Sequence, residues 1–139
     1  MKKRLFAIFI AGLCCSFHIE NNTLKGVWEY QGDVSNGKKE GAPTDYSLQR
    51  RYTDSTYAGF IVEKGVKPEK YEGGNYKLKN DTCLETQTYS LQPSTQVGKT
   101  IQYLYTIHND TLTLKGILAN GTAVEEYWKR VSSKPKAKQ

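Results

Sequence analysis

The sequence predicts an all-β protein, an eight-stranded antiparallel up-and-down barrel. Apolar and polar residues alternate in several segments, which is typical of strands with one buried face. The dipeptides Asn80-Asp81, Asn109-Asp110 and Asn120-Gly121 separate such segments and suit the tight turns of hairpins. No segment has the apolar stripe of a helix, and 139 residues suffice for one domain with its own core. Closing the sheet into a barrel removes both exposed edges.

Turn and loop residues bound each expected strand. The first strand contains Gly26-Val27-Trp28 and leads into a loop over 33–44 that is rich in Gly, Lys and Asn. This loop either covers the mouth of the barrel or is a plain flexible connection. A second flexible stretch, 63–70, precedes the fourth strand, in which Gly73-Gly74 marks a bulge or bend. The expected strands cover residues 24–33, 44–53, 56–63, 70–79, 82–91, 99–108, 111–118 and 122–131.

The N-terminus has the pattern of a secretory signal peptide over residues 1–16. A basic start, 1–4, precedes an apolar run, 5–13, that is too short to span a membrane. Cleavage after Ser16 predicts an exported protein, periplasmic or secreted. Acylation at Cys14 or Cys15 would instead give a lipoprotein, and only then do we expect contact with a membrane. The remaining alternative is an N-terminal apolar strand of a cytosolic protein.

Net charge does not favour a nucleic-acid partner. The formal charge of +6 comes from 20 basic and 14 acidic residues, but three lysines and arginines lie in the signal and three lysines in the tail over 132–139. The predicted barrel, 24–131, together with the short linker 17–23 is therefore close to neutral. We interpret the tail as a disordered, solubilising end. A weak contact with a polyanion is the alternative.

Tyrosine and arginine supply the candidate ligand-binding residues. The chain has ten tyrosines, and those in strands would give a lumen large apolar faces with hydroxyl groups. The alternative is that they lie half-buried on the outer face. Arg50 and Arg51 point to opposite faces, so one of them can point inward and bind a carboxylate, or form a structural ion pair. The predicted ligand-binding set is Tyr46, Arg50, Tyr57, Tyr89, Tyr103 and Tyr105.

Signals for catalysis, metals and cofactors are absent from the sequence. The two histidines lie beside the predicted cleavage point, His18, and at a hairpin turn, His108. Glu125 and Glu126 face opposite ways on a strand and make a poor catalytic pair. Cys83 is either a small buried residue or a reactive thiol. We therefore expect no enzyme, no metal site and no cofactor.

Two short motifs resemble the signature of lipocalins and their calycin relatives. These are Gly26-x-Trp28 on the first strand and Trp128-Lys129-Arg130 on the last, with Trp128 and Arg130 on one face. The resemblance implies a barrel end in which Gly26, Trp28, Trp128 and Arg130 are structural, with Arg130 packed over Trp28. It is similar above all to small secreted lipocalin-like proteins of Bacteroidetes, among them families of unknown function. The Arg-x-Tyr of the fatty-acid-binding branch is missing near the C-terminus, so fatty-acid binding is not supported.

Two functions follow from these observations. An exported barrel with tyrosine-rich strands predicts binding of a small hydrophobic or amphipathic ligand in the lumen. The alternative is a barrel with a filled lumen that contacts or inhibits a protein partner through its loops, in particular through loop 33–44.

Overall fold

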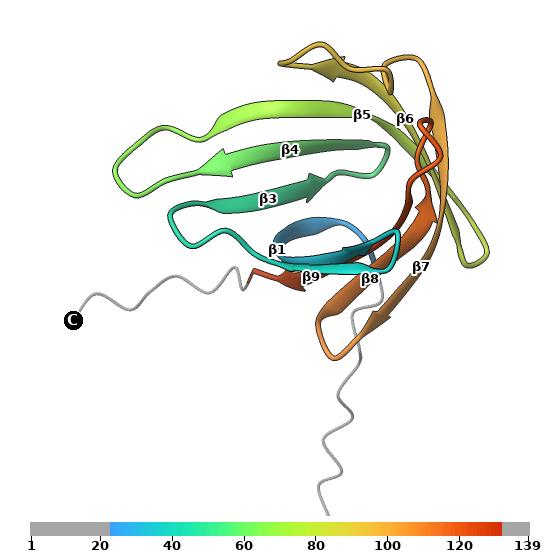
Figure 1. The fold of residues 1–139 in the computed structure, drawn as a ribbon, viewed down its shortest axis with the longest axis horizontal. Coiled ribbons are helices and arrows are strands. Elements are labelled where there is room, and N and C mark those ends of the chain that lie inside the picture. Colours follow the sequence, from blue (N-terminus) through green and yellow to red (C-terminus); the bar gives the residue numbers. More distant parts are fainter. Residues whose placement is uncertain (1–22, 132–139) are drawn as a thin grey trace, which may run out of the picture.

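The computed structural model describes residues 23–131 as one antiparallel sheet rolled into a closed barrel (Figure 1). The all-β, eight-stranded prediction is confirmed, with one short strand added. The predicted signal peptide with Cys14 and Cys15, most of the linker, and the tail lie outside the described residues. Within the described part, no helix of a length and hydropathy that would cross a membrane occurs. The strands are β1 (Gly26–Ser35), β2 (Lys38–Gly41), β3 (Ser47–Tyr52), β4 (Thr56–Val62), β5 (Glu69–Lys79), β6 (Thr82–Ser90), β7 (Thr100–His108), β8 (Thr111–Ile117) and β9 (Ala123–Arg130).

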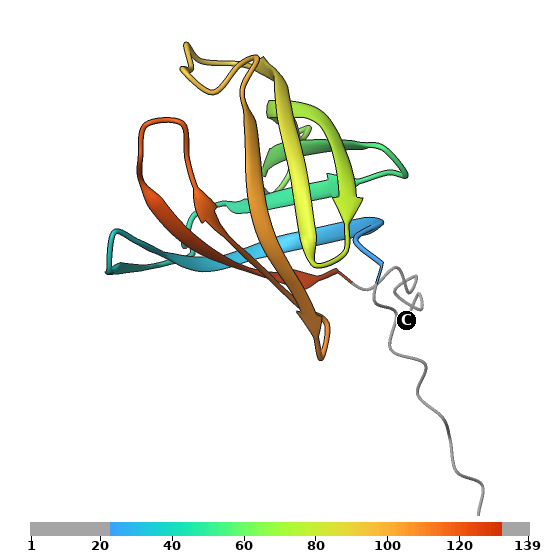
Figure 2. The same ribbon diagram turned by 90° about the vertical axis from the view of Figure 1, so that its right-hand side faces the viewer.

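Strand β1 closes the barrel because it pairs on both of its edges. Its first half pairs with β3, and nearly its whole length pairs with β9. All other barrel strands pair with their neighbours in chain order, which is the up-and-down topology (Figure 2). β2 pairs only with the second half of β1 and adds a short flap to the barrel.

The prediction of a loop over residues 33–44 is wrong in part. β1 continues to Ser35, and Asn36 and Gly37 then form a tight turn into β2. Both turn residues have positive φ, 48° and 82°, as hairpin turns of this kind require. The sequence interpretation weighed the Gly and Lys content of this segment and missed the Asn-Gly pair. The irregular connection is only Ala42 to Tyr46.

The two ends of the barrel differ in the length of their connections. At one end the strands are joined by tight turns, among them Asn80-Asp81 and Asn109-Asp110, with positive φ at Asn80, Asn109 and Asp110. At the other end lie the β1–β2 flap and the connections 42–46, 63–68, 91–99 and 118–122. We call the first the closed end and the second the open end.

Trp28 and Arg130 meet at the closed end. The Arg130 guanidinium lies 4.1 Å from the centroid of the Trp28 ring, and the Trp28 indole donates to the carbonyl of Leu24 over 2.8 Å. Arg130 also donates to the carbonyls of Thr23 and Lys25. These contacts fasten the chain before β1 across the barrel end. Trp28 and Leu24 are fully buried, so this end is sealed.

Three register shifts, in β1, β5 and β6, change which side chains face inward. The shift in β1 lies between Tyr30 and Gly32 and leaves Gln31 without a partner residue on β9. The register shifts between Gly59 and Phe60 of β4 and leaves Tyr71 of β5 without a partner residue on that strand. It shifts again between Gly73 and Gly74, as the glycine pair predicts, and leaves Thr88 of β6 unpaired with β5. Because a bulge inserts one extra residue, it breaks the strict alternation of inward and outward side chains.

Candidate ligand-binding lumen

Arg50 of β3 points into the barrel and is 4% exposed. It pairs across the sheet with Trp28 of β1 and Gly59 of β4, and all three therefore share the inner face. Arg51 points outward, where its guanidinium packs 4.1 Å from the centroid of the Phe60 ring. The two arginines thus point to opposite faces, as predicted, and Arg50 is the one that points inward.

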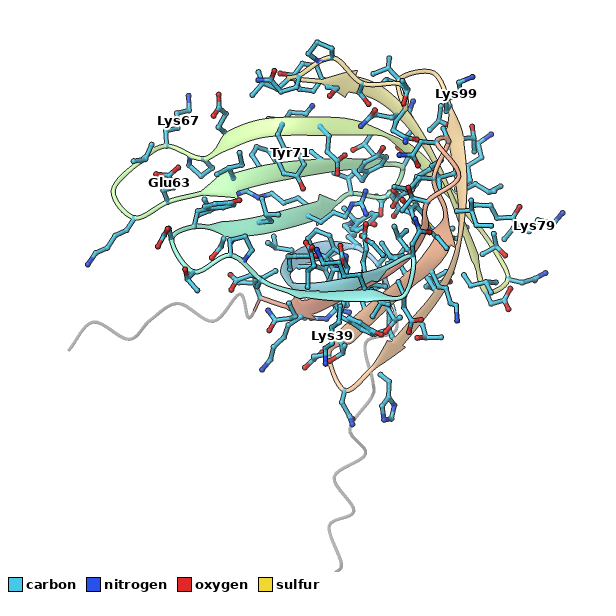
Figure 3. The ribbon with its side chains drawn as sticks, viewed as in Figure 1. Lys39, Glu63, Lys67, Tyr71, Lys79 and Lys99 are labelled. Carbon is cyan, nitrogen blue, oxygen red and sulfur yellow. The ribbon has the colours of Figure 1, made fainter. Side chains whose placement is uncertain are left out.

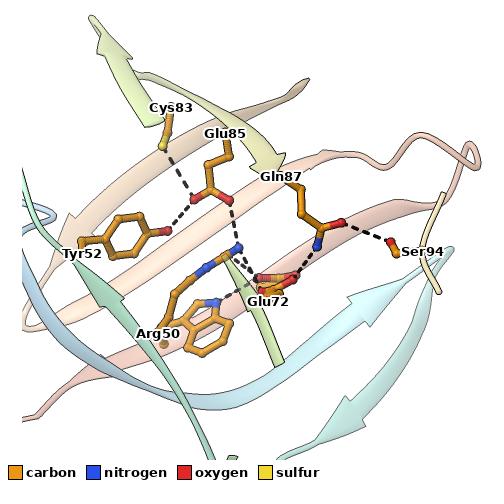
Figure 4. Close-up of polar contacts among 9 residues, drawn as sticks. Arg50, Tyr52, Glu72, Cys83, Glu85, Gln87 and Ser94 are labelled. Carbon is orange, nitrogen blue, oxygen red and sulfur yellow. Dashed lines mark hydrogen bonds and ion pairs between the residues drawn. The ribbon is translucent and has the colours of Figure 1, made fainter. Parts of the chain in front are cut away.

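Three carboxylates surround the guanidinium of Arg50 (Figure 4). Nη2 lies 2.8 Å from Oε2 of Glu85 and 3.4 Å from Oε1 of Glu72. Nη1 lies 3.6 Å from Oε2 of Glu126. Because the glutamates come from β6, β5 and β9, the cluster ties both halves of the barrel together. The Nε atom of Arg50 is buried and has no hydrogen-bond partner among the described residues.

Polar side chains orient these carboxylates. The Tyr52 hydroxyl donates to Oε1 of Glu85 over 2.6 Å, and the Trp128 indole donates to Oε2 of Glu126 over 3.0 Å. On the far side of Glu72, the amide of Gln87 donates to Oε2 over 3.2 Å, and Ser94 donates to Gln87. The side chains are therefore held in place by contacts within the lumen.

The cluster carries more negative than positive charge. One guanidinium faces three carboxylates, and each carboxylate is largely removed from water. Burial raises the pKa of Glu85 and of Glu126, and the Arg50 charge opposes that rise in both. The lumen therefore favours uptake of a positive charge, either as protons or as a bound cation.

Two cavities flank the cluster. One has a volume of about 160 Å3 and lies below the open-end connections, where Gln96 and Leu118 line it with Tyr57 and Tyr103. The other, of about 200 Å3, lies on the side of β1, β3 and β5. Arg50, Glu72 and Glu126 line both, so these side chains separate them. The lumen is thus not wholly filled by its own side chains.

The structure brings together half of the predicted ligand-binding residues. Arg50, Tyr57 and Tyr103 line the first cavity, and the Arg50 guanidinium lies 4.8 Å from the centroid of the Tyr57 ring. Tyr105 packs against the core and donates to the carbonyl of Asn80 at the closed end, away from both cavities.

Tyr46 and Tyr89, in contrast, do not line either cavity, so the expected lumen position is not found for them. Tyr46 lies in the connection before β3 and is 40% exposed. Tyr89 follows the unpaired Thr88, so the bulge turns it outward; it is 39% exposed, and the Lys70 amine lies 5.1 Å from its ring centroid. Strict alternation from Glu85 and Gln87 would have placed Tyr89 inside.

The four residues expected at the barrel end divide into two groups. Gly26, Trp28 and Arg130 lie at the closed end, where an added Cβ at Gly26 would come 3.3 Å from Arg130. Trp128 lies deeper, 5.6 Å from the Arg50 guanidinium, and packs edge-on against Tyr30 with ring centroids 5.1 Å apart. It lines the second cavity and belongs to the lumen.

The carboxylates and Tyr71 were missed from the sequence. Glu85 and Gln87 alternate with neighbouring residues and share the face of buried Cys83, which is a readable signal for inward polar groups. Glu126 shares the face of Trp128 in the same way. Tyr71 and Glu72 are adjacent yet both line the second cavity, because Tyr71 is the bulge residue. Figure 3 shows Tyr71 within the barrel, whereas Lys67, Lys79 and Lys99 project away from it.

A separate groove lies on the outer face. It has a volume of about 730 Å3 and runs over β7, β8, β9 and the end of β1. Leu104 and Ile117, 52% and 65% exposed, are its most accessible apolar side chains. Among residues 23–131, no group of three or more His, Cys, Asp or Glu side chains is placed to hold a metal ion.

Fold and site together define a closed antiparallel barrel whose partly empty lumen contains a buried cluster of one arginine and three glutamates. The chain belongs to a family described as a domain of unknown function (DUF4488), whose model matches residues 23–139. No curated protein matches it. Solved structures similar to it include that of a mutant of the fluorescent protein UnaG, with 10% sequence identity and a TM-score of 0.39. That match covers 79% of this chain and 97% of the other.

Proposed function

We propose that this protein is an exported, non-enzymatic binding protein that holds a small amphipathic molecule in the open half of its lumen. The observation that carries the proposal is the pair of cavities on either side of Arg50, Glu72 and Glu126. A barrel that needed only stability would fill this space with apolar side chains. Export is proposed from the basic, apolar and small-residue order of residues 1–16.

The size and lining of the cavities restrict the ligand. Their volumes, about 160 and 200 Å3, are below the roughly 300–1,000 Å3 of pockets for drug-sized molecules. Charged groups and tyrosine hydroxyls line them, so a purely hydrophobic ligand would leave carboxylates buried without compensation. Of the hydrophobic and amphipathic ligands that the sequence predicts, we therefore propose an amphipathic one.

The two tryptophans of the chain provide the test. The Trp128 indole N–H lies in the lumen, and that of Trp28 lies at the closed end. Residues 17–139, purified from a bacterial periplasm, are examined by native mass spectrometry and by NMR, with small cations, anions and neutral molecules added. We expect a releasable added mass, or a ligand that shifts the Trp128 signal and leaves the Trp28 signal in place. A bare polypeptide whose Trp128 signal no added molecule shifts would refute lumen binding.

The outer groove favours a second candidate, contact with a protein partner. Exposed Leu104 and Ile117 line this groove together with Val34 and Gly37, which lie in the segment 33–44 that was expected to contact a partner. If this candidate is correct, Ile117→Arg or shortening of the flap abolishes partner binding, and Arg50 variants that still fold do not. Partner binding that survives both changes would exclude it.

A further inference from the structure

We infer that the second cavity of the lumen binds a small organic ammonium cation. The inference rests on the proposed function, lumen binding, and names the chemical class of the ligand. Its basis is the combination of carboxylates and aromatic rings around one space. The cavity is lined by Tyr30, Asp33, Leu48, Arg50, Tyr71, Glu72, Glu126 and Trp128.

The first argument is an unpaired acceptor in the wall of this cavity. Oδ1 of Asp33 is buried and accepts no hydrogen bond within residues 23–131, although the Tyr30 hydroxyl interacts with the Asp33 carboxylate; burial and this contact raise the pKa of Tyr30. Asp33 pairs with Glu126 across β1 and β9, so both carboxylates share the inner face. A buried carboxylate oxygen without a donor is costly, and a cation or an N–H donor of a ligand would satisfy it.

The second argument is the charge balance. Asp33, Glu72 and Glu126 bring three carboxylates to the cavity, and Arg50 is the only cation in its lining. The shortest ion pair of Arg50 is with Glu85, which does not line this cavity. Part of the Arg50 charge is therefore balanced by a carboxylate outside the cavity. Protons or an organic cation would balance the excess, because buried charges are tolerated only when they are neutralised or paired. The aromatic rings in the same lining favour the organic cation.

The third argument is the set of aromatic rings. Tyr30, Tyr71 and Trp128 lie around the cavity, and their π faces attract cations, including quaternary ammonium groups. Gly59 makes this arrangement possible, since a Cβ there would lie 2.7 Å from Cζ of Tyr71 and 2.8 Å from Cγ of Glu72. A glycine on β4 and a bulge on β5 thus bring one ring and one carboxylate into the same space.

The geometry also argues against a carboxylate ligand. The Nη atoms of Arg50 already face Glu85, Glu72 and Glu126, and only its Nε lacks a partner. An anion at this place would gain one hydrogen bond and approach three carboxylates. Like charges that are brought close together in a buried site repel one another strongly.

The test compares three molecules of nearly the same shape. Full-length protein is titrated with choline, with neutral 3,3-dimethylbutan-1-ol and with 3,3-dimethylbutanoate, and the Trp128 indole signal is followed by NMR. We expect choline to bind at least about tenfold more tightly than the neutral alcohol, as a desolvated cation–π site implies. The anion should bind most weakly.

Matched variants identify the groups responsible. Asp33→Asn and Glu126→Gln should each weaken choline binding several-fold and leave binding of the neutral alcohol unchanged. Glu125→Gln is the control, because Glu125 is the neighbour of Glu126 on the outer face and bonds to Tyr127 and Lys115. Thermal unfolding establishes that each variant is folded.

The outcomes separate this inference from lumen binding itself. If the alcohol or the anion binds as tightly as choline, or if neither variant weakens choline binding, the cation assignment is overturned and the lumen is still a binding site. If none of the three shifts the Trp128 signal, the cation assignment is also overturned. Lumen binding is then decided by the co-purified mass and the wider set of molecules.

Discussion

Arg50→Met tests whether the lumen cluster behaves as a buried ion pair. Methionine keeps an unbranched apolar chain and removes the guanidinium that lies 2.8 Å from Glu85. Glu85 is 2% exposed and would be left without a cation. Breaking a buried ion pair from one side costs about 3–5 kcal/mol, which is a large share of the roughly 5–15 kcal/mol typical of a domain.

The loss should depend on pH in a definite direction. Burial raises the pKa of Glu85 and Glu126 above the ordinary value of 4.5, and Arg50 limits the rise. A carboxyl whose pKa is higher in the folded state stabilises the fold below its unfolded pKa, and that stability is lost as the pH rises through the folded pKa. Removing Arg50 raises both pKa values further. The variant should therefore lose more stability at pH 8 than at pH 5.

Urea denaturation followed by circular dichroism at both pH values measures this difference. The double variant Arg50→Met/Glu85→Gln should recover much of the loss at pH 8, since the buried charge is gone. Arg51→Met is the control, because Arg51 lies on the outer face against Phe60 and contacts no lumen carboxylate in the described residues. Equal losses at the two pH values, or an equal loss in the control, would refute a buried ion-pair cluster.

Three further outcomes follow from single residues. Trp28→Ala should cost about 3–5 kcal/mol in the free energy of unfolding, because it empties a fully buried site; an unchanged urea midpoint would disprove the closed-end packing. Burial raises the pKa of the Cys83 thiol to about 12, so a thiol reagent such as DTNB should react with Cys83 only on unfolding; fast labelling of native protein, beyond any by Cys14 or Cys15, would contradict this. Gly59→Ala should displace Tyr71 and weaken choline binding in the NMR titration, and unchanged affinity would show that the contact relaxes freely.

Alternation and turn chemistry were sufficient to predict the barrel. Asn80 and Asn109 supply the positive φ angles of hairpin turns, and the runs between them alternate apolar and polar side chains. Tyr57 and Tyr103, which were chosen because they lie in expected strands, line the first cavity, and no bulge separates either from its partners on the adjacent strand. The strand topology could therefore be predicted from local sequence.

The site was less predictable because it depends on breaks in that rule. Tyr71 and Glu72 both face inward only because the pairing of β5 with β4 shifts between Gly59 and Phe60. No residue type in β5 indicates from the sequence where this bulge lies. Glu85 was missed for another reason. A lone glutamate in a strand is expected to face water, and only its contact with Arg50, 35 residues away, makes burial tolerable.

The interior of the barrel is built in two different ways. Leu24 and Trp28 at the closed end belong to one apolar cluster with Leu112 and Leu114, and all four are fully buried. The open half places ionised groups beside empty space, although apolar side chains of similar volume would often be neutral or stabilising there. A requirement for stability explains the apolar packing at the closed end, but it does not explain the charged groups in the open half. Substitutions at Trp28 should therefore act on unfolding, and Glu126→Gln should act first on ligand affinity, which makes the two halves separable by experiment.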